Sequence, residues 1–330
     1  MRMSFPFRMR LALSAVAAVI VAMSGLTSAQ ILYPLYDGYN LVDLGVNMPG
    51  WNFAYAINNN GQVVGDMQQW GGSLTAFRTQ ANQPMTSSDG LGVLSGDYRS
   101  YAWALDNNGY VYGESVHNNS YIQSRGYRWG YNGAVMEDLH PTAFTATNSS
   151  YRGTNDYGWN VGYYTTGKFG TPHALISFGS PYTYQMDTWL SSPAPYSSAA
   201  FDSNNLDQMV GWMSQYSTSQ PRAFMFDAAA NVWRRMDIPT LSGGIWNKAY
   251  AINESSQIVG ESDKWVGTSR WTHAFLFRDA NKNYVIDTGE LVDLDVNNST
   301  QSAALAINNS GVAVGYSGSP DIVYGNSRAM

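Results

Sequence analysis

Residues 279–290 have the residue types and the spacing of a calcium-binding loop. Side-chain oxygens stand at positions 1, 3, 5, 9 and 12 of this stretch, and position 7 offers a backbone carbonyl; the six residues are Asp279, Asn281, Asn283, Val285, Asp287 and Glu290. Calcium takes about six to eight oxygen ligands, and an acid at position 12 binds it through both oxygens. The stretch predicts a calcium site of the modest affinity found in extracellular proteins.

The loop also departs from the usual pattern. Tyr284 occupies the sixth position, where a glycine normally makes a sharp turn, and the flanking patterns indicate strands instead of helices. We interpret the stretch as a loop of the EF-hand type within a β-hairpin. The alternative is a polar hairpin loop that binds no ion.

Other residues favour structural roles over catalysis. The chain has four histidines and no cysteine, and no nucleophile-elbow or phosphate-loop motif occurs. His173 and His273 hold equivalent positions in a repeat, which favours a structural or surface role. One aspartate position also recurs, and hydrogen bonds to neighbouring turns explain it better than paired acid–base chemistry; it is occupied by Asp43, Asp138, Asp187, Asp237 and Asp293. We predict that the protein is not an enzyme.

These residues belong to a repeat whose period is about 49 residues. Its closing glycines are Gly65, Gly113, Gly162, Gly211, Gly260 and Gly315, which are 48, 49, 49, 49 and 55 residues apart. Such a period is the signature of a repeat architecture. We place the units at about 53–100, 101–150, 151–198, 199–248, 249–302 and 303–330.

Each unit is expected to form four short strands. The first strand has an Ala-x-Ala-Ile pattern, and a tight turn that begins with Asn or Asp follows it. The second strand ends in the closing glycine, which indicates close approach to a neighbouring backbone. The third carries His-Ala-Phe or a variant of it, and the fourth carries the recurring aspartate.

One such unit cannot bury both faces alone, so the units must stack in a line or around a ring. The last unit has no fourth strand, whereas residues 40–46 resemble a fourth strand with no unit before it. We therefore predict an all-β, six-bladed β-propeller of four-stranded blades, closed by an N-terminal strand that completes the last blade. The alternative is an open array, cut from a longer chain.

The repeat resembles the HAF family of probable extracellular bacterial proteins. The resemblance is carried by Tyr55-Ala-Ile-Asn-Asn-Asn-Gly-Gln-Val-Val-Gly65, by His273-Ala-Phe275 and by Asp43-Leu-Gly45, and it covers most of residues 40–330. It implies a repeat architecture and a location outside the cell. It implies no activity.

The N-terminus and the composition agree with export. Residues 1–29 have arginines followed by an apolar core and small residues, which is typical of a signal peptide, and 30–330 would then be the repeat domain. An uncleaved anchor is the alternative. With a net charge of −6, the chain has no basic character that would indicate a nucleic-acid partner. We expect a secreted or cell-surface monomer, with membrane contact only through the signal segment.

The sequence leaves the function open between three classes. We favour a non-enzymatic module that binds a glycan or other surface ligand through aromatic side chains in its loops. The candidates are Trp70, Tyr121, Trp129, Tyr131, Tyr163, Tyr164, Trp189, Tyr216, Trp246, Trp265 and Trp271. A structural or interaction module of a surface or matrix assembly, with a surface protein as partner, is the second reading, and a polysaccharide-acting enzyme is the third.

Overall fold

The structure is a computed structural model of the whole chain. It describes Leu44 and residues 50–68, 72–117, 123–130, 133–167, 170–178, 182–228, 233–295, 301–318 and 328–329. The predicted signal segment 1–29 lies outside these residues, as does all of 40–46 except Leu44. Across the described ranges, no helix is both long and apolar enough to cross a membrane.

Four sheets of four antiparallel strands follow one another along the chain, each pairing its strands in sequence order. Their strands are β1 (Asn52–Ile57), β2 (Val63–Gln68), β3 (Leu74–Arg78) and β4 (Gly90–Gly92); β5 (Asp97–Leu105), β6 (Val111–His117), β7 (Gln123–Gly130) and β8 (Gly133–Asp138); β9 (Asn148–Thr154), β10 (Asn160–Thr165), β11 (Pro172–Ser177) and β12 (Thr183–Gln185); β13 (Ser197–Ser203), β14 (Gln208–Ser214), β15 (Arg222–Asp227) and β16 (Arg234–Asp237). The repeat predicted from the sequence is therefore a four-stranded sheet.

The fifth sheet has seven strands. These are β17 (Asn247–Ile252), β18 (Ile258–Val266), β19 (Ser269–Phe277), β20 (Leu291–Asp293), β21 (Gln301–Ile307), β22 (Ala313–Gly318) and β23 (Arg328–Ala329). Short helical turns complete the elements: η1 (Ser87–Asp89), η2 (Thr142–Phe144) and α1 (Asp187–Leu190).

The predicted number of six blades is wrong, because the described strands form five sheets. The described strands of the last repeat are β21, β22 and β23, and a parallel bridge from Thr272 to Gln301 joins them to the fifth sheet. Of the segment predicted to close the ring, only Leu44 is described. Its carbonyl accepts a hydrogen bond from the Met85 backbone at 3.1 Å, so it lies against the first sheet.

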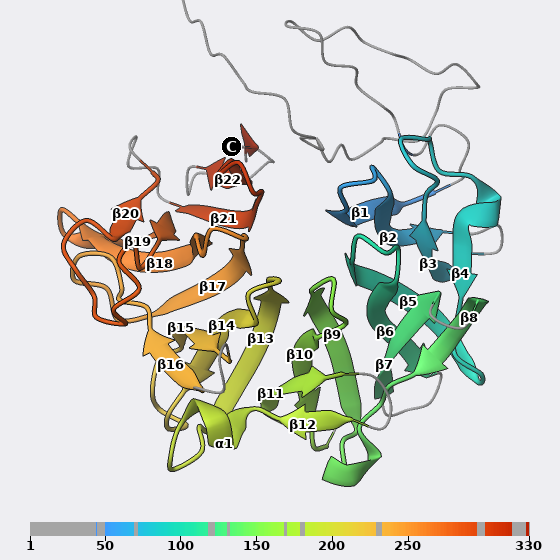
Figure 1. Cartoon of the computed structure of the whole chain (residues 1–330), viewed down its shortest axis with the longest axis horizontal. Helices are drawn as coiled ribbons and strands as arrows, with labels where there is room; N and C mark the ends of the chain where they lie inside the picture. The colour runs from blue at the N-terminus through green and yellow to red at the C-terminus, as the bar shows by residue number, and fades with distance from the viewer. Residues whose placement is uncertain are drawn as a thin grey trace, which may run out of the picture.

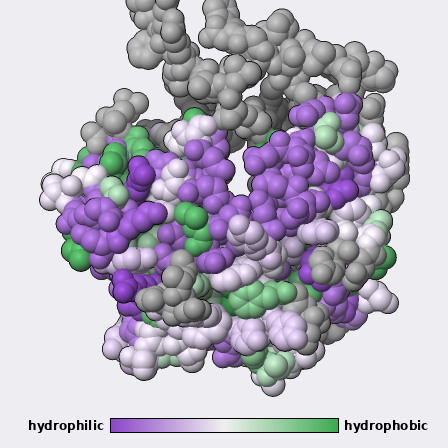
Figure 2. Space-filling model, viewed as in Figure 1, coloured by the Kyte–Doolittle hydropathy of each residue, from purple (hydrophilic) through white to green (hydrophobic). Residues whose placement is uncertain are grey.

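The five sheets surround a common centre in the arrangement of a β-propeller, with the first strand of each sheet innermost (Figure 1). Successive first strands contact one another, from β1 to β5, β9, β13, β17 and on to β21. Figure 2 shows an opening near the middle of the molecule, bordered mainly by hydrophilic residues. Side chains on the innermost strands are therefore the ones that can face this centre.

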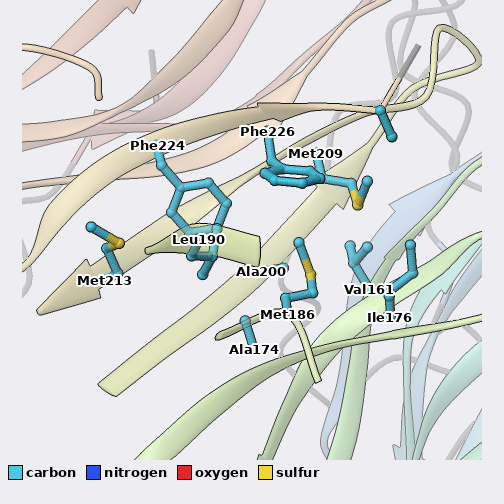
Figure 3. Packing of buried hydrophobic residues seen from close by; sticks show 11 residues of the cluster. Val161, Ala174, Ile176, Met186, Leu190, Ala200, Met209, Met213, Phe224 and Phe226 are labelled. Atoms are coloured by element: carbon cyan, nitrogen blue, oxygen red, sulfur yellow. The ribbon is translucent and has the colours of Figure 1, made fainter. Parts of the chain in front are cut away.

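Apolar side chains between adjacent sheets form the core. In the cluster between the third and fourth sheets, Phe224, Phe226 and Met209 of the fourth sheet pack together with Val161 and Ile176 of the third (Figure 3). A recurring hydrogen bond also connects each pair of successive repeats. A backbone N–H of the third strand donates to a side chain on the first strand of the next repeat, over 2.7–3.0 Å. These acceptors are Ser100, Ser149, Ser198, Asn247 and Ser302.

The closing glycines are required by close packing against the first strand. A Cβ at Gly113 would lie 1.9 Å from the carbonyl oxygen of Tyr101, and one at Gly65 would lie 1.8 Å from that of Phe53. All six closing glycines show the same approach. The close backbone contact predicted from the sequence is therefore present, and any larger residue would separate the first two strands.

Candidate functional site

Every first strand carries a β-bulge, and in four of the six strands the bulged residue is the x of an Ala-x-Ala pattern. In β1, for example, Ala54 pairs with Gly65 and Ala56 with Val64, which leaves Tyr55 without a partner in the ladder. We name the six bulged residues the inner belt; they are Tyr55, Trp103, Arg152, Phe201, Tyr250 and Leu305. A bulge redirects a side chain and often occurs next to a functional site.

Members of the inner belt contact one another across sheet boundaries. The rings of Tyr55 and Trp103 have centroids 4.4 Å apart, and the Arg152 guanidinium carbon lies 3.9 Å from the centre of the Trp103 ring. Farther round, the ring centroids of Phe201 and Tyr250 are 5.6 Å apart. The belt thus places aromatic surface on the innermost strands of successive sheets.

A second set of side chains supports the belt from the second strands. This partner row consists of the residues that follow the closing glycines: Asp66, Glu114, Tyr163, Trp212, Glu261 and Tyr316. Within one sheet, the Trp103 indole N–H donates to Glu114 at 3.3 Å, and the Tyr250 hydroxyl donates to Glu261. Arg152 donates to the Tyr163 hydroxyl at 3.0 Å. In these three sheets, the inner-belt residue is therefore hydrogen-bonded to the partner-row residue of the same sheet.

The acids of the row differ in their surroundings. Glu114 lies 3.7 Å from Arg152, but Asp66 and Glu261 have no cationic partner within the described part of the chain. Asp66 is 1% exposed and one of its carboxyl oxygens has no partner there. Burial raises the pKa of Asp66, and burial together with Asp66 raises the pKa of Tyr55, which donates to that carboxyl. Both uncompensated acids thus lie beside aromatic members of the belt.

The turns after the first strands meet at the centre and connect neighbouring sheets. The Asn58 amide donates to the Asp106 carbonyl at 3.0 Å, and Asn155, Asn204 and Asn253 make the same contact with the next turn. Asp106 is the exception, because a carboxylate has no proton to donate. Its second oxygen is buried and unpartnered among the described atoms, and burial raises its pKa to about 6.

The predicted calcium loop brings together its six residues, which hydrogen bonds connect to one another. Both oxygens of Asp279 accept backbone hydrogen bonds, from Asn283 at 3.2 Å and from Tyr284 at 2.9 Å. The Glu290 carboxylate folds back to accept from the Ala280 and Asp287 backbones, each at 2.9 Å. Tyr284 adopts a φ of 61°, so the chain makes the left-handed turn at position 6 without glycine.

In this structure, the side-chain oxygens of the loop do not all point toward one position where an ion could bind. The side-chain amides of Asn281 and Asn283 donate to Asp287 at 2.7 and 3.0 Å, so their NH₂ groups face its carboxylate. Among the described residues, no group of three or more acidic or histidine side chains is arranged to hold a metal ion. Calcium would therefore require both amides to turn. Val285 was predicted to bind through its backbone carbonyl, and its side chain is exposed.

The recurring histidines and aspartates pair with each other inside the sheets. His173 Nδ1 lies 2.6 Å from Asp187, and His273 Nδ1 lies 3.0 Å from Asp293. Arg125 takes the histidine's place and donates to Asp138 at 2.7 Å. Two of these contacts join a third to a fourth strand, and that of His173 joins a third strand to the start of α1, which supports the structural interpretation of both positions.

The loop aromatics predicted as ligand contacts do not form one site. Tyr216 and Trp265 are exposed, Tyr164 is buried, and Trp129 packs against the core between the first two sheets. Trp70, Tyr121 and Tyr131 lie outside the described residues. Only Tyr163 belongs to the belt and its partner row. The sequence did contain a partial signal for the belt: in four units a residue that varies in type, Tyr55, Trp103, Tyr250 or Leu305, stands between two alanines.

Comparison with models of known protein families and with characterised proteins finds no match to this chain. The resemblance to HAF repeats therefore stays a prediction. Any statement of function depends on the geometry of the belt, the row and the calcium loop.

Proposed function

We propose that this chain is an exported, non-enzymatic β-propeller that binds a glycan at the inner belt. The observation that carries the proposal is the set of bulges, which puts Tyr55, Trp103, Phe201 and Tyr250 on the innermost strands. Flat aromatic rings bind the apolar faces of sugars, and neighbouring carboxylates accept hydrogen bonds from sugar hydroxyls. The export part of the proposal is supported by the signal-peptide pattern of residues 1–29 in the sequence.

The experiment is binding to a glycan array by the wild-type protein and two variants. Trp103→Ala removes a ring that contacts belt members on both sides, and we expect it to abolish or strongly weaken binding. Tyr216→Ala is the matched control, since this aromatic residue is 65% exposed and lies outside the belt. Equal losses in both variants, or wild-type binding to no glycan, would contradict the proposal.

A second candidate is an interaction module whose fifth sheet is stiffened by calcium. The observation that favours it is the loop 279–290, which already has the left-handed turn at Tyr284 and the returning Glu290 side chain. Its partner would be another surface protein. A chelator that abolishes binding to such a partner, without changing glycan binding, would separate the two candidates.

A further inference from the structure

Two hydroxyl–carboxylate pairs in the belt and row have the same construction. Tyr55 donates to Asp66 in the first sheet, and Tyr250 donates to Glu261 in the fifth. Each pair has a second aromatic ring from an adjacent sheet beside it: Trp103, 4.4 Å from Tyr55, and Phe201, 5.6 Å from Tyr250. Each pair therefore combines a negative charge with two aromatic faces.

Neither carboxylate forms an ion pair. Glu114 lies 3.7 Å from Arg152, whereas no cationic nitrogen lies within 4 Å of Asp66 or Glu261 in the described part of the protein, and Lys248, opposite Glu261 in the ladder, does not reach it. The unpartnered oxygen of Asp66 is buried in a side chain that is 1% exposed. A buried carboxylate without a counter-ion is unfavourable, and a cation placed against it removes that cost.

We infer that the glycan bound at the inner belt carries primary amines, with an ammonium group of the ligand placed against Asp66, Glu261 or both. This inference rests on the proposed function. An ammonium group donates charge-assisted hydrogen bonds to a carboxylate, and it is attracted to the faces of Tyr and Trp rings. The sugar rings that carry it stack on the same aromatic side chains. An acidic sugar would meet two uncompensated carboxylates and be repelled.

The test compares three oligosaccharides of equal length by calorimetry at about pH 6, where sugar amines are protonated. They are a glucosamine oligomer, its fully N-acetylated form, and a galacturonic acid oligomer. We expect the glucosamine oligomer to bind at least about tenfold more tightly than the acetylated one, since a hydrogen bond to a charged group contributes about 1.5–3 kcal/mol. Added salt should reduce this preference.

Variants separate the amine preference from glycan binding itself. Glu261→Gln and Asp66→Asn should bring the two affinities within about twofold of each other, mainly by weakening binding of the glucosamine oligomer. Asp237→Asn, on the outer strand β16, is the control and should keep the wild-type preference. Equal wild-type affinities for the amine and its acetylated form would overturn this inference and leave the belt proposal standing. Tighter binding of the acid oligomer, or binding of none of the three, would overturn it as well, whereas the proposal of glycan binding at the belt is decided by the array.

Discussion

Arg152 lies over Trp103, with its guanidinium carbon 3.9 Å from the centre of the ring, and this contact joins the inner strands of the second and third sheets. Both residues are the bulged residues of their strands. The contact shows that the bulges build a continuous surface between sheets. The first predictions concern the framework that holds this surface in place.

Asp106 and Asp202 should make stability depend on pH. Burial raises the pKa of Asp106 to about 6 and that of Asp202 to about 7, from an ordinary 3.8. A raised pKa means that the folded state holds the proton longer than the unfolded chain does, so their stabilising contribution is complete below about pH 4 and is lost as the pH rises through 6 to 7. Denaturant unfolding at pH 5 and pH 8 should show the lower free energy of unfolding at pH 8.

Asp106→Asn should raise the free energy of unfolding at pH 8 by about 1–3 kcal/mol, because an amide can donate to the next turn as Asn58 does. Asn204→Asp is the matched control in an equivalent turn and should have the opposite effect. If the free energy of unfolding of Asp106→Asn changed with pH as that of the wild type does, groups other than Asp106 would be responsible for the pH dependence.

Calcium should stabilise the protein through the loop at 279–290. With about 10 mM calcium and a dissociation constant of about 0.1–1 mM, the expected gain is about 1.4–2.7 kcal/mol. Thermal unfolding should therefore shift upward by about 3–8 °C. Glu290→Gln should remove the shift, because Glu290 is the residue expected to bind through both oxygens; the same shift in this variant would mean that calcium binds elsewhere.

Gly113→Ala should be strongly destabilising. Its Cβ would lie 1.9 Å from a backbone carbonyl oxygen that cannot move away by side-chain rotation, so we expect a loss of about 2–4 kcal/mol. Gly133→Ala is the comparison, since no heavy atom lies within 4 Å of its Cβ position and only the positive φ of 87° opposes it. That variant should lose about 1–2 kcal/mol. Equal losses in denaturant unfolding would mean that the close approach has no special cost.

Asp207→Gly should stabilise the fourth sheet. Asp207 has a φ of 59° at the position where four equivalent turns have glycine at 75–87°, and the acidic side chain lies near Asp227, which contributes to its raised pKa after burial. Removing the strained conformation should add about 1 kcal/mol. Gly158→Ala, in the matching turn of the third sheet, should lose a similar amount. A destabilised Asp207→Gly would show that the carboxylate makes a favourable contact that outweighs the strain.

Much of the sheet structure follows from the spacing of a few residue types. The closing glycines and the Asn or Asp turns marked the first hairpin of each repeat, and Ala76-Phe77 and Ala274-Phe275 lie on the third strands β3 and β19. The number of blades could not be predicted from this spacing. Whether the last repeat joins its neighbour depends on contacts such as that between Thr272 and Gln301, which no local pattern encodes.

The candidate sites differ in how far the sequence could predict them. The candidate calcium loop could be recognised because its proposed ligands are close together in sequence. The inner belt could not, because alternation of large and small residues looks the same in a regular strand and in a bulged one. Ala54 and Ala56 pair with consecutive residues, Gly65 and Val64, and only this shift in register turns Tyr55 out of the ladder.

A crystal structure of the protein with the glycan that it binds most tightly on the array would test the central claim most directly. The account predicts a sugar ring stacked within about 4–5 Å of Tyr55, Trp103 or Tyr250, at the centre of the propeller. A sugar bound on the outer loops, with these three rings free of contact, would contradict it.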